Sequence, residues 1–253
     1  MEHAFLDRYS SIDSPVHRLD PRAKVLLALV FVITVVSTPP THLLAFVVYA
    51  GLVSWTIALA RVPLAWVLFR AAAVLPLSVL AALWLPFLRH GDTLSLFAGR
   101  LHLSIPGLWL FAGVAMKSFL GAAAAVLLVS TTPMSSLLQG LARLGAPVIL
   151  VDLLALTYRY LFVLAGEAMR LRRAAFARGC RPRWLGQSLL IGRLIGQLFL
   201  RSYARAERLY AAMVLRGYDG RMPASRPLAF RAVDLAALVI LSVNLLLVRI
   251  LLR

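Results

Sequence analysis

Two short stretches in the second half of the chain carry its most distinctive chemistry, because each places an arginine directly before a glycine at the predicted end of a long helix. The stretches are Ala177-Arg178-Gly179 and Leu215-Arg216-Gly217. Glycine closes a helix in the left-handed conformation without strain, and arginine in the last turn is favoured by the helix macrodipole. Ordinary capping explains either stretch alone. Two of them in one basic region favour docking, since a guanidinium on a rigid helix end suits bidentate pairing with a partner's carboxylates.

Two long helices are expected to carry these ends. The first spans about 148–178 and the second about 187–216, and a proline follows each of them, Pro182 and Pro223. At 1.5 Å per residue the first helix is about 45 Å long. The sequence therefore predicts a pair of rigid rods with cationic ends.

Other kinds of reactive site are missing from the sequence. It contains no nucleotide-binding loop ending in Gly-Lys-Ser/Thr and no His-Glu-x-x-His helix. Asp152 and Glu167 share a helix but are fifteen positions apart, so nothing pairs them as general acid and base. The single cysteine, Cys180, excludes an internal disulfide. The histidines are scattered singly, at His3, His17, His42, His90 and His102. We expect a chain that is not an enzyme, with no catalytic residue, no metal site and no cofactor of its own.

The composition indicates an integral membrane protein. Hydrophobic residues make up 61% of the 253 residues, and the mean hydropathy is +0.86, more than a soluble core of this size needs. The formal charge of +17 is carried mostly by arginine. A nucleic-acid partner is not expected, because the basic stretch has no recognisable reading motif. Basic cytoplasmic loops beside anionic lipid headgroups explain the charge better.

Apolar runs predict an all-α fold with about five transmembrane helices, four and six being the alternatives. The runs cover 25–36, 43–60, 64–88, 108–130 and 233–252. The Pro39-Pro40 turn separates the first two, and polar and apolar residues alternate over 89–105, which predicts a short hairpin or an interfacial loop. A sixth span at 148–165 stays open. Gly113 and Gly121 should let the fourth helix approach its neighbours closely.

The distribution of basic residues predicts the orientation. Positive charges gather in the N-terminal segment and in the loop after the second run, at Arg8, Arg18, Arg22, Lys24 and Arg61. The positive-inside rule therefore places the N-terminus in the cytoplasm. We expect residues 1–131 to hold the N-terminal segment and the first four spans. Residues 132–226 should form a cytoplasmic domain of two long, crossing helices, and 227–253 the last transmembrane helix.

Several motifs resemble those of one known family. They are His17-Arg18-Leu19-Asp20-Pro21-Arg22-Ala23-Lys24, Thr157-Tyr158-Arg159-Tyr160, Arg201-Ser202-Tyr203 with Ala206-Glu207-Arg208, and Leu215-Arg216-Gly217-Tyr218-Asp219-Gly220. Over nearly its whole length the chain resembles the transmembrane (T) component of energy-coupling factor (ECF) transporters, and among these the CbiQ-like proteins of cobalt uptake. The N-terminal motif favours cobalt over other substrates of such systems.

The resemblance implies a mechanical role in the bacterial inner membrane. The two helices would be coupling helices whose Ala-Arg-Gly ends insert into two CbiO-like ATPase subunits. The first end matches this motif fully, whereas the second has Leu215 in place of alanine, which leaves Arg216 and Gly217 as its functional pair. Arg159, Glu207 and Arg208 would support the helices. A separate CbiM-like membrane subunit, with or without a small CbiN-like one, would bind cobalt, and ATP would be used by the ATPase subunits.

Two further possibilities stay open. A T component of a nickel or vitamin importer would share these motifs. A self-contained carrier or channel would need ionisable residues inside the membrane, for which Lys117 is the best candidate and Arg70 and Asn244 are weaker ones. Such a carrier would leave the arginine ends unexplained. The resemblance also implies that apolar residues of the coupling helices face the substrate subunit, although helix packing explains any single one of them better; they are Leu153, Leu154, Met169 and Met213.

Overall fold

The computed structural model describes residues 12–84, 93–96, 101–179, 188–220 and 232–251, and the structural statements below concern this part of the chain. The predicted histidine and cysteine positions His3, His90 and Cys180 lie outside it, as do Pro182 and Pro223. The chain divides into two compact units. The first unit is Met1–Gly140 with Leu228–Arg253, and the second is Leu141–Pro227.

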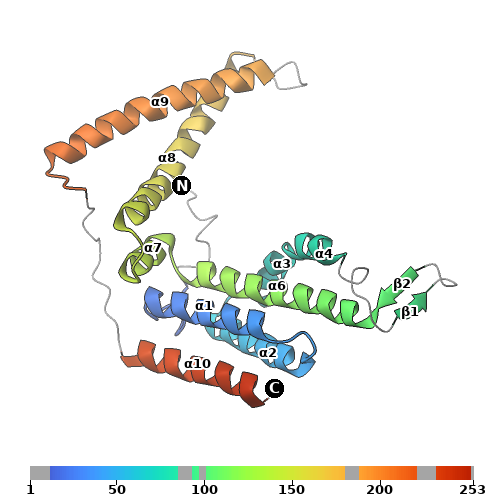
Figure 1. Ribbon diagram of the computed structural model, residues 1–253. Coiled ribbons are helices and arrows are strands. Elements are labelled where there is room, and N and C mark those ends of the chain that lie inside the picture. Colours follow the sequence, from blue (N-terminus) through green and yellow to red (C-terminus); the bar gives the residue numbers. More distant parts are fainter. Residues whose placement is uncertain (1–11, 85–92, 97–100, 180–187, 221–231, 252–253) are drawn as a thin grey trace. The chain divides into compact units, whose positions relative to one another are not determined.

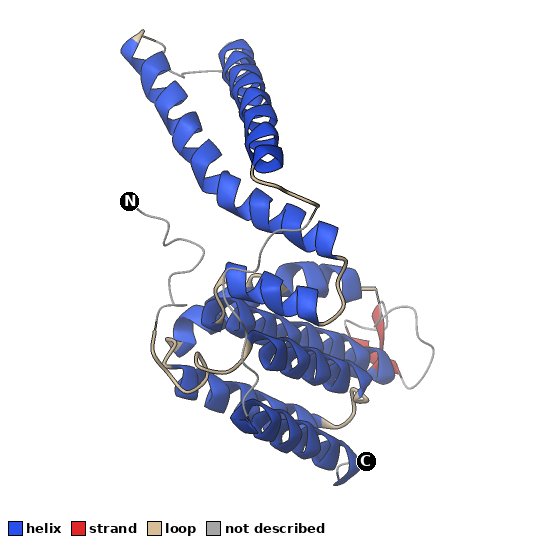
Figure 2. Cartoon of the chain, turned by 90° about the vertical axis from the view of Figure 1, so that its left-hand side faces the viewer, coloured by secondary structure: helices blue, strands red, loops and turns tan. Residues whose placement is uncertain are grey.

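The fold is α-helical, as predicted, with one small hairpin (Figure 1). In chain order the elements are α1 (Pro21–Ser37), α2 (Leu43–Ala60), α3 (Leu64–Ala72), α4 (Leu75–Ala82), β1 (Thr93–Leu96), β2 (Leu101–Ser104), α6 (Ile105–Thr131), α7 (Met134–Arg143), α8 (Val148–Ala177), α9 (Ser188–Leu215) and α10 (Ala232–Leu251). Strands β1 and β2 pair antiparallel, with Thr93 opposite Ser104, so the expected hairpin is confirmed. It is the only red element in Figure 2.

Two features differ from the sequence prediction. The helix expected over 64–88 is interrupted: α3 and α4 are separate, and the break falls just before Pro76, in the first turn of α4. Together they still form one apolar segment long enough for a single span, Leu64–Ala82, and residues 85–88 lie outside the described part of the chain. Proline lacks an N–H and its ring clashes with the preceding turn, so it starts a helix more readily than it continues one. The short helix α7 was not predicted. It begins directly after Pro133, whose carbonyl accepts hydrogen bonds from Ser136 and Leu137 N–H.

Several helices are suited by length and composition to cross a bilayer. Within the described residues, four helical segments are long and apolar enough, namely Leu64–Ala82, Ile105–Thr131, Val148–Ala177 and Ala232–Arg249. The apolar helix Leu43–Leu59 is slightly shorter. Much of this apolar surface points outward; the Phe69 side chain, for example, is 82% exposed. Lipid tails rather than water are the natural surroundings of such a surface.

Helix α6 is central to the first unit, because α1, α2, α3 and α4 all pack against it (Figure 1). Leu120 of α6 belongs to a buried cluster with Phe31 of α1 and with Phe46 and Tyr49 of α2. The Tyr49 ring meets Phe31 and Phe46 edge-on, with centroids 6.1 and 6.4 Å apart. Helix α10 packs on α1 and α2, so the last helix of the chain lies beside the first two.

A glycine lets α6 approach the turn between α1 and α2. A Cβ added at Gly113 would lie 2.5 Å from the Pro40 Cβ, closer than two carbon atoms can come. The expected close approach is therefore present at Gly113. Gly121 lies eight residues further along α6, and a Cβ added there would meet no atom within 4 Å in the described structure.

The N-terminal motif is a structural clasp centred on Asp20. The Asp20 carboxylate caps α1, since its Oδ1 accepts a hydrogen bond from Arg22 N–H at 2.9 Å. The Asp20 backbone N–H in turn donates to Asp234 Oδ1 at 2.8 Å. Both aspartates are buried. The motif thereby fixes the start of α1 against the start of α10.

Two lysines tie helix ends together in the same unit. Lys24 Nζ donates to His17 O at 3.1 Å and to Thr131 O, at the end of α6, at 2.9 Å. Lys117 Nζ donates to Val36 O, in the last turn of α1, at 2.8 Å. The last carbonyls of a helix have no partner of their own, and a cation there is also favoured by the macrodipole. Lys117, the best candidate for a carrier residue, is thus engaged in holding α6 to α1.

The two glycines of α6 provide a matched test of this packing. We expect Gly113→Ala to lower the stability of the protein in detergent by about 1 to 3 kcal/mol, because Pro40 must move. Gly121→Ala should be neutral or raise stability by up to about 1 kcal/mol, since alanine favours the helix and the space is open. Thermal unfolding followed by circular dichroism measures both. Equal effects of the two substitutions on stability would contradict the close contact between Gly113 and Pro40.

Candidate functional site

The second unit contains the predicted docking helices, α8 and α9, which contact each other over part of their length. The helices are splayed, and α9 starts near the end of α8 and runs away from it (Figure 1). The end of α8 therefore lies near one end of α9, and the second predicted docking stretch lies at the other (Figure 1). The two arginine-glycine ends therefore lie apart from each other.

The first end closes as capping chemistry predicts. Ala177 is the last residue of α8, and the Arg178 N–H is shared between two carbonyls of the last turn at 3.2 Å each. Gly179 has φ +80° and donates its N–H to Phe176 O at 3.0 Å. A side chain at this left-handed position would be strained, so glycine allows the helix to stop directly after the arginine.

The second end has the complete hydrogen-bond pattern of a Schellman motif. Leu215 ends α9, and Gly217 follows Arg216 with φ +80°. The Gly217 N–H donates to the carbonyl three residues earlier at 2.9 Å, and the Tyr218 N–H donates to Met213 O at 3.0 Å. Both bonds satisfy carbonyls that a helix end leaves without partners. The backbone of this end is therefore fixed by its own hydrogen bonds.

Both arginine side chains are available to a partner. Arg178 and Arg216 are exposed, and neither guanidinium has a hydrogen bond or ion pair within the described residues. Leu215 is 88% exposed, which is unusual for so large an apolar side chain on a helix end. An exposed guanidinium beside exposed apolar surface is the combination found in buried contacts between proteins.

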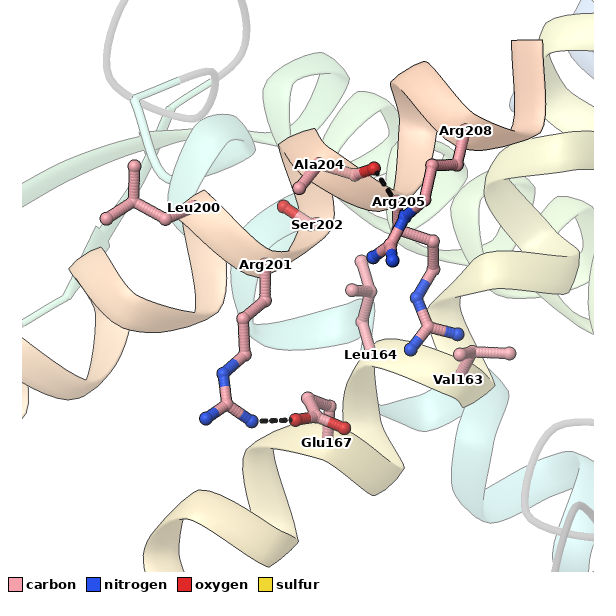
Figure 3. A pocket seen from close by; sticks show the side chains of 9 residues that line it. All are labelled: Val163, Leu164, Glu167, Leu200, Arg201, Ser202, Ala204, Arg205 and Arg208. Carbon is pink, nitrogen blue, oxygen red and sulfur yellow. Dashed lines mark hydrogen bonds and ion pairs between the residues drawn. The ribbon is translucent and has the colours of Figure 1, made fainter. Parts of the chain in front are cut away.

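One ion pair joins α8 to α9 between these ends (Figure 3). Glu167 Oε1 accepts from Arg201 Nη1 of α9 at 2.5 Å, and its Oε2 accepts from Arg170 Nη2 at 2.5 Å. The Glu167 side chain is only 12% exposed, whereas the two arginines reach it from solvent. Charge-assisted hydrogen bonds of this kind are stronger than those between neutral groups, and two of them meet on the Glu167 carboxylate. Sequence reasoning missed both ion pairs. The i,i+3 spacing of Glu167 and Arg170 was a usable signal for the local pair, but not for the pair with Arg201.

The ion pair divides the two helices into arms. Arg178 lies eleven residues beyond Glu167, which is about 17 Å of helix, and Arg216 lies fifteen residues beyond Arg201, about 22 Å. Both arms are continuous helix up to their caps. Each end is therefore connected to the Glu167–Arg201 pair by unbroken helix.

The predicted supporting residues are separated rather than clustered. Arg159 and Glu207 are exposed on α8 and α9, without an ion pair in the described structure. Arg208 Nε donates to Ala204 O at 3.1 Å. Arg208 also lines a cavity of about 350 Å³ beside the Glu167–Arg201 pair (Figure 3). Their supporting role stays a prediction.

The apolar residues predicted to face another subunit lie on the same helices. Leu153, Leu154 and Met169 are exposed on α8, and Met213 of α9 is half-buried. Within the described residues, no group of three or more His, Cys, Asp and Glu side chains is placed to hold a metal ion.

Removing the charge of Glu167 should loosen the contact between α8 and α9. We expect Glu167→Gln to broaden the distance distribution between spin labels on Ala174 and Ala211, because the neutral amide no longer attracts either arginine. Pulsed electron resonance on the doubly labelled chain, carrying Cys180→Ser to remove the native thiol, measures that distribution.

Arg193→Gln is the control, since Arg193 is an exposed arginine of α9 that forms no ion pair among the described residues. The distance distribution between the spin labels in this control should equal that of the parent. The same narrow distribution in Glu167→Gln as in the parent would show that the ion pair does not hold the helices.

Comparisons with known proteins place this arrangement in a family. The model of the CbiQ family, described as cobalt transport protein, matches residues 13–226, which include both arginine-glycine ends. The cobalt transport protein CbiQ of Rhodobacter capsulatus is 32% identical over 217 residues, 81% of this chain and 83% of that protein. The energy-coupling factor transporter transmembrane protein EcfT of Listeria innocua is 28% identical over 256 residues, 96% of each chain. Nickel permease LarQ of Lactiplantibacillus plantarum is 36% identical over 122 residues, 46% of this chain and 44% of that protein.

The match covers most of the chain, and the apolar helices fit a protein that crosses the membrane several times. The chain is therefore a multi-pass membrane protein that belongs to the CbiQ family of cobalt transport proteins, the transmembrane components of energy-coupling factor transporters.

Proposed function

We propose that this chain couples ATP hydrolysis by two cytoplasmic ATPase subunits to the uptake of cobalt. The ATPase subunits are of the CbiO-like, ATP-binding-cassette type, and a separate CbiM-like membrane subunit binds the metal as cargo. The observation that carries the proposal is the pair of exposed arginine-glycine ends, Arg178-Gly179 and Arg216-Gly217, at separate places on two helices joined by an ion pair. Two contact points suit two ATPase subunits.

Each end would dock by its arginine. The guanidinium pairs with carboxylates in a groove of the ATPase subunit, and the glycine lets the chain turn away so that only the helix end enters. When ATP closes the two ATPase subunits, each groove moves its helix end. The rigid arms carry that motion past Glu167 and Arg201, so this pair becomes the point where the angle between the helices changes. The chain itself performs no catalysis and binds no cofactor, and ATP is used by the partners.

The motion would reach the substrate subunit through apolar contacts. Leu153 and Leu154 are exposed on α8, on the side of Glu167 away from the cationic end, and Met169 is exposed two residues beyond Glu167. Flexible apolar side chains can slide against a partner without breaking directional bonds. This surface suits a CbiM-like subunit, with or without a small CbiN-like one beside it.

The proposed orientation in the membrane follows from the positions of the basic residues and from the hydrogen bonds around Asp20 and Lys24. Arg22 and Lys24 lie at the start of α1, and Arg61 follows the end of α2. Hydrogen bonds join the same end of the first unit to the end of α6 and the start of α10. The cationic side chains thus collect at one end of the bundle, which supports a cytoplasmic N-terminus in a bacterial inner membrane.

Nickel is the second candidate cargo, because one relative is named a nickel permease. A vitamin importer would use the same coupling device. A self-contained carrier is less well supported, since Lys117 is engaged with the Val36 carbonyl and Arg70 lies over the Trp66 ring at 4.5 Å. Both side chains already have partners within the bundle.

Removal of both guanidiniums tests the docking. We expect Arg178→Ala or Arg216→Ala to weaken binding of the ATPase subunits by about 2 to 5 kcal/mol each, the usual cost of removing one partner of a buried charged pair. The double variant should abolish uptake. Co-purification of the ATPase subunits with the tagged chain in mild detergent measures binding, and accumulation of radioactive cobalt or nickel in cells measures transport.

Arg249→Ala is the control, because Arg249 is an exposed arginine at the end of α10, outside the second unit. It should insert, bind the ATPase subunits and transport like the parent. Undiminished co-purification with the double variant would refute docking by the arginine ends. Uptake of nickel in preference to cobalt would replace the cargo and leave the coupling role intact.

A further inference from the structure

Arg61 occupies a backbone position that favours glycine. It follows α2 as the C-cap residue with φ +55°, and it is the only non-glycine residue with a positive φ within the described structure. A branched or long side chain gains nothing from this conformation, which glycine adopts without strain. No hydrogen bond or ion pair of its side chain is present among the described residues. An uncommon backbone conformation combined with an unpaired guanidinium indicates that the side chain itself has a use.

The Arg61 side chain lines a polar cavity of about 460 Å³ at the cationic end of the first unit. Three other charged residues share this cavity, and each already has a partner. Arg18 and Asp13 form an ion pair at 2.6 Å, and the Arg18 guanidinium holds the pKa of the Asp13 carboxyl below its usual value. Asp234 is buried and accepts the Asp20 N–H at 2.8 Å. Among the described residues that line this cavity, Arg61 is thus the cation without an ion pair, although its charge also acts on Asp13.

An apolar groove of about 290 Å³ adjoins this cavity, and Leu19 lines both. Helices α1, α2, α6 and α10 all contribute to the groove, through residues that include Phe31, Leu52, Leu128, Ala237 and Leu245. Along α10, the distance from Asp234 in the polar cavity to Leu245 in the groove is eleven residues, or about 16 Å. One leaflet of a bilayer has about the same hydrocarbon depth, half of roughly 30 Å.

We propose that the cavity and groove together bind one anionic phospholipid from the leaflet on the N-terminal side. Its phosphate pairs with Arg61, and one acyl chain lies in the groove between α1 and α10. Anionic lipids are concentrated in the cytoplasmic leaflet, the side on which the charge distribution places this end of the bundle. The charged cavity at one end and the apolar groove beside it match the two chemically different parts of a phospholipid. The site lies in the first unit, so it does not depend on docking of the ATPase subunits to the second.

Native mass spectrometry of the full chain tests the proposal. The probe is a liposome that contains equal amounts of phosphatidylglycerol and phosphatidylcholine with identical acyl chains. The parent chain released from it should retain one phosphatidylglycerol in preference to phosphatidylcholine. Arg61→Gly should reduce that preference about fivefold, the effect of one basic residue near an anionic surface. Glycine suits the local backbone, so this variant is expected to fold. Arg61→Lys should keep most of the preference, and Arg249→Gln should keep all of it.

A second pair of variants tests the acyl chain. Ala237→Phe places a ring in the groove and should lower retention of both lipids, whereas Ala236→Phe, on the neighbouring exposed residue, should leave retention unchanged. Equal retention of the two lipids by the parent would overturn the proposal. It would also be overturned if Arg61→Gly, with an unchanged melting temperature, kept the full preference, or if Ala236→Phe and Ala237→Phe behaved alike.

Discussion

The structure of this chain is governed by one constraint, that a backbone surrounded by hydrocarbon must satisfy its own hydrogen bonds. Helices meet that requirement everywhere except in their first and last turns. Several polar side chains of the first unit bond to backbone groups there. Asp20 caps the start of α1, Lys24 donates to the last carbonyl of α6, and Lys117 donates to a carbonyl in the last turn of α1. The two lysine bonds also join α1 to α6, so the same side chains satisfy the backbone and hold the bundle together.

The second unit uses helix ends differently. Its two caps are completed by glycine and backbone hydrogen bonds, which leaves the neighbouring arginines exposed. The helices touch each other over only part of their length, and Glu167 supplies the one charged link between them that the described residues contain. A bundle packed as closely as the first unit would resist a change of helix angle. Two splayed helices with a single polar link can change their angle while each helix stays rigid.

Much of this architecture could be predicted from the sequence, and the reasons for the failures are physical. The bounds of α2 were predicted correctly because a proline turn and an arginine enclose its apolar run. The left-handed glycines were predictable too, since capping is decided within one turn of helix. The break at Pro76 was missed because the membrane often tolerates proline inside a helix, and only neighbouring packing decides the outcome. The partners of Glu167, Lys24 and Lys117 depend on which helices become neighbours, and hydrophobic periodicity does not determine that.

The clasp at Asp20 has a consequence for the time course of synthesis. Its backbone N–H is bonded to Asp234, 214 residues later in the chain. At about 5 to 20 residues per second, the ribosome needs roughly 10 to 40 s to make the intervening segment. During that interval the amide of Asp20 and the surface of α1 that packs on α10 lack the partners that they have in the complete chain. The bundle is completed only when its last helix arrives, so truncation near the C-terminus affects the beginning of the chain as directly as its end.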